Sequence, residues 1–201
     1  MAWDFAAEIH ALTGFDADNS GTTASGETYR VHATQWLTDS AKEVINRLPA
    51  NLLKLCSSQQ TFTSGSANTL NTGKILEVFR NDGDIDQPCR KINSVQKGRF
   101  SDSEDMNYAT VTDPVFFIEN NSIDVLPVGG SCTYSEVQFP SVSFDDTAIA
   151  VFPDEAERAV VLSAAIKAAE YMLVRDEDIE LLNPILAQLK DDYKQELVGF
   201  K

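Results

Sequence analysis

Apolar residues recur at three- and four-residue steps near the end of the chain and predict two amphipathic helices there. The first spans residues 152–173, and its repeating apolar positions are Leu162, Ala165, Ile166, Ala169, Met172 and Leu173. These positions fall on one stripe of a helix. The stripe is widened by four more apolar residues, Val160, Val161, Ala164 and Ala168. Only a narrow band with Ser163, Lys167 and Glu170 suits contact with water, so we expect this helix to pack on two sides.

The start of that helix and the whole of the next one carry clear local signals. Pro153 and the acids that follow it favour a helix start, because proline lacks an amide hydrogen and negative charge suits the amino end of the helix dipole. The second helix has a buried stripe made of Ile185, Leu186, Leu189, Tyr193 and Leu197. We expect Asn183 to cap it and Pro184 to occupy its first turn, which leaves residues 176–182 as a separate turn.

The first part of the chain is also helical by pattern. Residues 3–12 predict a short amphipathic helix that ends at Gly14. Residues 34–48 predict a longer helix that Pro49 ends, and residues 51–56 add a helical turn. We expect the apolar face over residues 37–48 to pack on the helix over residues 152–173. The two ends of the chain would then form one helical module.

Between these ends the periodicity changes to short runs of β-forming residues broken by Gly, Asn, Asp and Ser. The runs lie at residues 61–63, 75–79, 108–111, 114–127, 131–139 and 149–152. Within 114–127, Asn120 and Asn121 suit a tight hairpin turn because asparagine tolerates a positive φ angle. The prediction is an α+β fold. A helical module from residues 1–57 and 151–201 carries an inserted antiparallel β-sandwich or barrel-like module at 58–150, with about five to seven strands.

Charge and composition exclude several classes of protein. The chain has 16 basic and 31 acidic residues and a net charge of −15. Such a balance argues against non-specific nucleic-acid binding and against an anionic membrane surface, both of which need Lys and Arg. No apolar run approaches the roughly 20 residues that span a bilayer. Cys56, Cys89 and Cys132 are odd in number, and the first residues lack a signal-peptide pattern, so we expect reduced thiols in a protein made in the cytoplasm.

One polar stretch, from Asp16 to Glu27, has the spacing of a calcium-binding loop. Asp16, Asp18 and Ser20 hold its first, third and fifth positions, glycine the sixth and glutamate the twelfth. Against calcium, residues 28–31 read as extended rather than helical, and Thr23 stands where a large apolar residue is usual. A polar surface loop explains the same residues. A calcium- or carbohydrate-binding module therefore stays open as an alternative.

Catalytic chemistry has little support in the sequence. There are two histidines, and no nucleophile elbow, phosphate-binding loop, dinucleotide fingerprint or C-x-x-C pair occurs. The many acids single out no acid–base pair. We therefore expect no enzyme and no cofactor, and we assign no catalytic, cofactor-binding or metal-binding residue. A structural or assembly role is the default expectation.

Three segments carry a resemblance to a known family. They are residues 36–49, residues 113–119 with the hairpin that follows, and residues 152–157 running into 164–169. Their order resembles head-to-tail adaptor proteins of tailed bacteriophages, the connectors beneath the portal. The resemblance implies a virion protein at the head–tail interface that forms a ring, expected to be twelvefold, between the portal protein and a tail or neck (nozzle or stopper) protein. DNA would pass through its channel during ejection without specific binding. Another neck, stopper, tail or capsid-decoration protein is the alternative.

Three further expectations follow from the resemblance. An acidic lumen would repel DNA phosphates and so reduce adhesion. The wide apolar face over residues 152–173 would pack on its own chain on one side and meet the next subunit of the ring with part of the other. Residues 198–201 would dock on a portal subunit.

Overall fold

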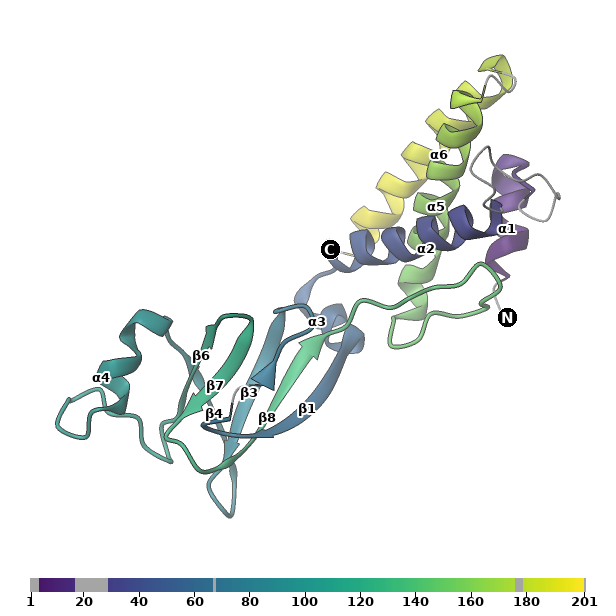
Figure 1. Cartoon of the computed structure of the whole chain (residues 1–201). Helices are drawn as coiled ribbons and strands as arrows, with labels where there is room; N and C mark the ends of the chain where they lie inside the picture. Colours follow the sequence, from purple (N-terminus) through teal and green to yellow (C-terminus); the bar gives the residue numbers. More distant parts are fainter. Residues whose placement is uncertain (1–3, 17–28, 67, 176–178, 201) are drawn as a thin grey trace. The chain divides into compact units, whose positions relative to one another are not determined.

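A computed structural model describes residues 4–16, 29–66, 68–175 and 179–200. The chain divides into two compact units (Figure 1), a helical unit of residues 1–56 and 139–201 and a β unit of residues 57–138. Helices at both ends of the chain flank an inserted region of sheet, so the predicted α+β fold class is confirmed. The first boundary lies next to the expected one, whereas the second differs and is explained below.

The helical unit is built from five α-helices and one short 3-10 helix among the described residues. They are α1 (Phe5–Thr13), α2 (Tyr29–Ile45), α3 (Ala50–Leu53), η1 (Lys54–Cys56), α5 (Asp154–Val174) and α6 (Ile179–Gly199). Asp4 caps α1 by accepting a hydrogen bond from the amide of Ala7 at 3.2 Å. Gly14 ends the helix with a φ of 75°, a conformation that favours glycine.

Helix α5 lies at the centre of the helical unit. It packs against α1, α2 and α6, and Figure 1 shows α6 running back along it while α2 crosses it. The expected packing of residues 37–48 on this helix is confirmed. Val160, Val161, Ala164 and Ala168 are all buried within the chain itself. Ile166 and Leu173 on the same helix are only partly buried, so the expectation that part of this apolar face meets a neighbouring subunit stays a prediction.

The narrow polar band expected on α5 is also covered in part. Ser163 is only 4% exposed. The Lys167 ammonium lies 2.9 Å from Ser40 Oγ and 3.9 Å from a carboxylate oxygen of Glu43, both on α2. Burial lowers the pKa of Lys167, while the negative charge of Glu43 opposes that shift. The band is thus a polar contact between helices rather than a face turned wholly to water.

Helix α6 follows the predicted stripe but begins earlier than expected. Leu189 and Tyr193 are buried, and Ile185, Leu186 and Leu197 are partly buried. Pro184 lies inside the helix rather than in its first turn, because α6 already starts at Ile179. The described residues of the expected separate turn at 176–182 are helical, and 176–178 lie outside the described residues. A proline this early removes one backbone hydrogen bond, which the packed turns that follow tolerate.

Residues 139–153 belong to the helical unit, which corrects the expected boundary at residue 150. A ladder of α2 side chains four residues apart holds this segment. Thr38 Oγ1 bonds both the amide and the carbonyl of Val142 at 3.1 Å. Thr34 Oγ1 accepts from the amide of Phe144 at 3.2 Å. Arg30 forms an ion pair with Asp145. Side-chain contacts of this kind leave no periodic signal in the sequence.

The β unit contains two four-stranded sheets with strand orders β1-β8-β3-β4 and β2-β7-β6-β5. The strands are β1 (Ser57–Thr63), β2 (Asn68–Thr69), β3 (Ile75–Asn81), β4 (Asp86–Pro88), β5 (Arg90–Lys91), β6 (Val115–Glu119), β7 (Ser122–Leu126) and β8 (Ser131–Val137). Both sheets contribute to one core of Leu70, Val78, Phe116, Ile123, Val125, Cys132 and Tyr134. The unit is therefore a small sandwich, antiparallel except where β5 pairs with β6.

The predicted hairpin is present as β6 and β7. Asn120 and Asn121 have φ angles of 49° and 58°, as the tight turn requires. Two other predicted strands are wrong. Residues 108–111 form turns, where Thr110 Oγ1 accepts from the amide of Asp113 at 3.1 Å. Residues 149–152 form no strand either, because the amide of Ile149 bonds the buried Glu157 carboxylate at 2.7 Å instead of a neighbouring strand.

A second buried carboxylate, Glu136, holds the turn between β2 and β3. Its Oε1 accepts from the amides of Thr72 and Gly73 at 2.6 and 2.9 Å. Its Oε2 is buried and has no hydrogen-bond partner among the described residues. A carboxylate that accepts two amide bonds fixes the turn firmly.

Among the described residues, every helix is too short or too polar to span a membrane.

The stripe on α6 predicts a strong response to a buried charge. Leu189 is 3% exposed, so we expect Leu189→Asp to lower the free energy of unfolding by about 3 kcal/mol or more, through an unpaired charge and a lost apolar contact. Urea denaturation followed by circular dichroism measures this change. Ala187→Asp places the same charge on an exposed position of the same helix and serves as the control. Equal stability of the two variants would contradict the assignment of the buried face.

Candidate functional site

No group of three or more His, Cys, Asp or Glu side chains able to hold a metal ion occurs within residues 4–16, 29–66, 68–175 and 179–200. Cys56, Cys89 and Cys132 are free. Burial raises the pKa of the Cys56 thiol to about 11, and it also raises the pKa of Cys89 and Cys132. A thiol protonated at neutral pH is a poor nucleophile and a poor metal ligand.

The predicted calcium loop lies almost entirely outside the described residues. Asp16 is described and is exposed, and the following helix begins at Tyr29. Residues 29–31 are therefore helical, and the expectation that they are extended is wrong. A calcium loop of this type is followed by a helix, so that objection no longer holds. The loop itself stays a prediction from its spacing.

The connection between β5 and β6 is the most distinctive surface feature of the β unit. These strands pair in parallel, with Arg90 opposite Val115 and Lys91 opposite Phe116. Parallel neighbours cannot be joined by a tight turn and need a crossover of a dozen or more residues. Residues 92–114 supply it and contain η2 (Ser94–Gln96) and α4 (Lys97–Ser101). We call this segment the crossover loop.

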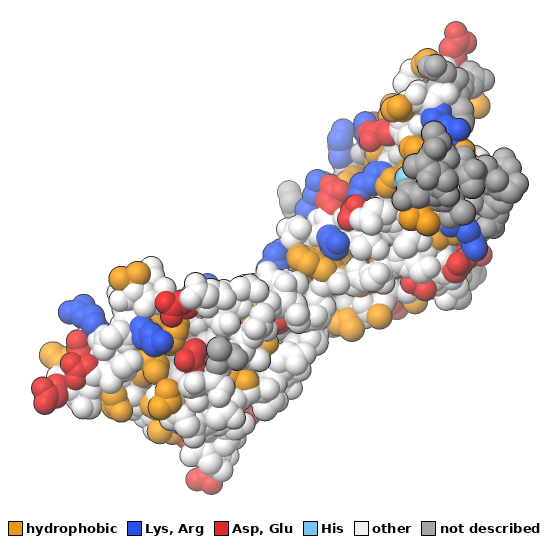
Figure 2. All heavy atoms as spheres, viewed as in Figure 1, with side chains coloured by type: hydrophobic (Ala, Val, Ile, Leu, Met, Phe, Trp, Pro, Cys, Tyr) orange, Lys and Arg blue, Asp and Glu red, His pale blue; other side chains and the backbone are white. Residues whose placement is uncertain are grey.

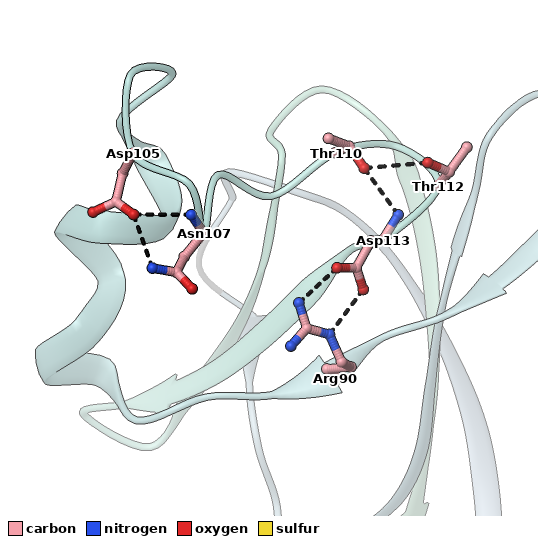
Figure 3. Close-up of polar contacts among 6 residues, drawn as sticks. All are labelled: Arg90, Asp105, Asn107, Thr110, Thr112 and Asp113. Carbon is pink, nitrogen blue, oxygen red and sulfur yellow. Dashed lines mark hydrogen bonds and ion pairs between the residues drawn. The ribbon is translucent and has the colours of Figure 1, made fainter.

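Internal contacts fix the crossover loop, as Figure 3 shows. Arg90 and Asp113, at its two ends, form a double contact in which Nε and Nη2 lie 2.8 and 2.6 Å from the carboxylate oxygens. The Asp105 carboxylate accepts from the backbone and side-chain amides of Asn107 at 2.8 Å. These bonds, led by the backbone one, lower the pKa of Asp105. The loop also packs Ala109, with Ile92 and Phe100, against an apolar cluster of the sheet. Short-range bonds and apolar contacts together therefore order it.

The crossover loop exposes apolar and basic side chains together. Val95 is 89% exposed and Met106 is fully exposed. Residues 90–99 contain four basic residues and no acid, although acids outnumber bases in the whole chain. A hollow of about 480 Å³ beside η2 is lined by Lys91, Ile92, Asn93, Ser94 and Ile118. In Figure 2, apolar and charged side chains gather at the end of the β unit that carries α4.

A second surface feature is a groove at the start of α5 that has two acids in its lining. Its volume is about 530 Å³, and its lining consists of Leu55, Val151, Phe152, Pro153, Asp154 and Glu155. Leu55 is 56% exposed and Val151 is 49% exposed. Val151 also has a φ of 54°, a left-handed conformation that is unfavourable for a β-branched side chain. We call this feature the α5 groove.

Two more surface features of the helical unit were not predicted from the sequence. At the end of the α5–α6 pair, Val174, Ile179 and Leu181 are exposed.

The second feature is an aromatic cluster between α1, α2 and α5. Its five rings pack edge to face or at a tilt: Phe15, Tyr29, His32, Trp36 and Tyr171. The Arg175 guanidinium lies 5.2 Å from the centre of the Tyr29 ring. Because Phe15, Tyr29 and Arg175 come from different segments, the cluster ties these segments together.

No protein-family model matches the chain, and a search of curated proteins finds no relative of it. Function therefore has to be inferred from the fold and its surfaces. The expectation that the chain has no catalytic, cofactor-binding or metal-binding residue stays a prediction. The structure adds two surface features, the crossover loop and the α5 groove.

The buried Cys56 thiol predicts a pH-dependent contribution to stability. Its folded pKa of about 11 exceeds the unfolded value of about 8.5. Between these pH values the unfolded state binds fewer protons than the folded state, so stability falls as pH rises. Urea denaturation between pH 8 and pH 10.5 should show the wild type losing stability relative to Cys56→Ser over this interval. A difference that stays constant with pH would contradict the raised pKa.

The double contact between Arg90 and Asp113 predicts a local effect on the crossover loop. Both side chains are more than half exposed, so Arg90→Gln should lower the global stability by no more than about 1 kcal/mol. Hydrogen exchange of the amides of Ile92 and Ala109 should nevertheless become faster, because the ends of the loop are released. Lys91→Gln removes a neighbouring exposed charge that makes no ion pair with the described residues. Equal exchange in both variants would count against the proposed restraint.

Proposed function

We propose that this chain is a virion structural protein of a tailed bacteriophage, a head-to-tail adaptor that forms a ring between the portal protein and a tail or neck protein. In this proposal the subunits surround a channel through which DNA passes without specific binding. In each subunit, the helical unit would form the body, and the β unit would provide additional contacts. The next paragraphs give the support from fold, surfaces and charge.

The layout of the fold supports the proposal. Both ends of the chain build one helical unit around α5, and a sandwich is inserted between α3 and the segment that returns along α2. Residues 36–49, 113–119 and 152–169, which carry the resemblance to adaptors, fall mainly on α2, on β6 and on α5 with the residues that precede it. Because likeness of fold supports a function only by analogy, the surfaces provide the stronger argument for the adaptor proposal.

The observation that carries the proposal is that the chain presents two unlike surfaces, each with exposed apolar side chains. A ring of identical subunits closes through heterologous contacts, in which one patch of a subunit meets a different patch of the next. The crossover loop exposes Val95 and Met106, and the α5 groove exposes Leu55 and Val151. A C2 dimer would need only one self-complementary patch. Two different patches fit a ring better.

The charge of the chain agrees with a channel wall. The net charge of −15 repels DNA phosphates and would lower adhesion as DNA slides past. Apolar side chains are exposed at the end of the α5–α6 pair, at Val174, Ile179 and Leu181, and near the end of α6, at Val198. These side chains would offer apolar contacts to a portal subunit. The proposed location of the protein is therefore the head–tail interface of the virion.

Two alternatives make different predictions. Another neck, stopper, tail or capsid-decoration protein would occupy a different place in a density map of the virion, since only the adaptor touches the portal. A calcium-binding module is favoured by the helix that begins at Tyr29 directly after the Asp16–Glu27 loop. Calorimetry with calcium decides this question, because heat that disappears in Asp16→Ala would support a metal site in the loop.

The adaptor proposal predicts assembly on the portal. When the purified chain is mixed with the portal protein of the same phage, we expect stoichiometric binding in size-exclusion chromatography and a ring on the portal in electron micrographs. An unrelated phage portal serves as the control for specificity. A chain that stays monomeric and has no affinity for its portal would contradict the proposal.

A further inference from the structure

We propose that the outer edge of β1 pairs with the same edge of a second copy of this chain, so that two free chains form an antiparallel dimer. The occupant of the edge is therefore β1 of another copy. This inference goes beyond the proposed function and does not rest on it, because a ring closes through two different patches whereas this contact is symmetric. It describes the chain in the absence of a portal.

The outer side of β1 is unpaired. The strand lies at the end of the order β1-β8-β3-β4 (Figure 1), and β8 is the one strand in the described part of the chain that pairs with it. The amide of Ser64, directly after β1, donates to the carbonyl of Gly130 at 2.9 Å, so even-numbered residues direct their backbone groups toward β8. Because this direction alternates along an antiparallel strand, the amides and carbonyls of Gln59 and Thr61 face outward. Neither residue has a backbone hydrogen bond on that side to any other residue that the structure describes.

The other three sheet edges carry features that hinder such pairing. β2 and β5 have two residues each, and both residues of β5, Arg90 and Lys91, are charged. β4 has three residues, among them Asp86 and Pro88. Short strands, charges and proline keep sheet edges from pairing with other chains. By contrast, β1 has seven residues without charge or proline, and its register with β8 has no bulge.

The lack of charge along β1 favours a second copy as the partner. Two copies with a net charge of −15 each repel one another over most of their surface. Residues 55–73, however, contain no charged residue, so two β1 edges can approach without like charges meeting. A partner for this edge also has to be extended and to have free backbone groups along one side. β1 of a second copy meets both conditions.

The strand is matched to itself in an antiparallel register with the twofold axis at Gln60. In this register the outward groups of Gln59 face those of Thr61 in the other copy, and the two residues exchange hydrogen bonds on both sides of the axis. The exposed Gln60 side chains of the two copies lie opposite each other and can bond through their amide groups. The pairing also covers an edge that would otherwise promote aggregation.

Hydrogen exchange at several protein concentrations tests the contact. The amides of Gln59 and Thr61 should exchange at least about tenfold more slowly in concentrated than in dilute solution, because pairing protects them. The amide of Gln60 faces β8 and is the internal control, with protection that does not change. Sedimentation equilibrium of the full chain should show a monomer converting to a dimer over the same range. A chain that stays monomeric up to about 1 mM would overturn the proposal, as would exchange at Gln59 and Thr61 that is independent of concentration.

A proline substitution provides the second test. Thr61→Pro removes an outward amide hydrogen and takes none from the pairing with β8, a position at which an edge strand tolerates proline. We expect association to weaken at least about tenfold. Thr61→Val keeps the amide and the shape of the side chain, so this matched control should associate like the wild type. Equal association of the two variants would overturn the proposal.

A charged variant covers the case in which proline disturbs the fold. Gln59→Lys with Thr61→Lys places like charges opposite each other in the dimer and should also weaken association at least about tenfold. Unaltered melting temperatures establish which variants are folded, and unchanged association of this folded variant would overturn the register. A wild type that is monomeric when free but forms a ring on the portal would overturn the edge contact alone. A free dimer without affinity for the portal would support the edge contact and contradict the adaptor proposal.

Discussion

The encasement of α5 is the constraint on which the helical unit depends. Its alanines let α1, α2 and α6 approach closely, and Ala164, Ala165 and Ala168 are fully buried. A larger side chain at such a position would force neighbouring helices apart at a cost of about 1–3 kcal/mol. Most of the apolar surface of α5 is therefore used within its own chain, and only residues such as Ile166 and Leu173 stay partly exposed.

Several loops are held by single side chains rather than by regular pairing. Thr34 and Thr38 hold residues 142–144, and the buried Glu157 holds the amide of Ile149. In the β unit, Glu136 fixes the turn before β3. Each of these bonds contributes on the order of 1 kcal/mol or somewhat more when the acceptor is charged. The bonds of Thr34, Thr38 and Glu157 hold the segment that leads to Val151 and the start of α5.

Periodic features could be predicted from the sequence, whereas features made by distant side chains could not. The α6 stripe around Leu189 and the Asn120–Asn121 turn depend on local spacing and backbone preference, and both are present. The assignment of residues 139–150 to the β unit failed because their partners, Thr34 and Thr38, lie about a hundred residues away in the sequence. The crossover loop was missed for a similar reason, since the parallel pairing of β5 with β6 involves strands too short to leave a pattern.

The acidity that suits a DNA channel creates a difficulty for the subunits themselves. Copies that each carry a net charge of −15 repel one another, although salt limits that repulsion to about 8 Å at physiological ionic strength. A ring therefore benefits from concentrating its few basic residues where subunits touch, since close pairs are screened least. In the proposed ring, the remaining acidic surface would repel DNA phosphates.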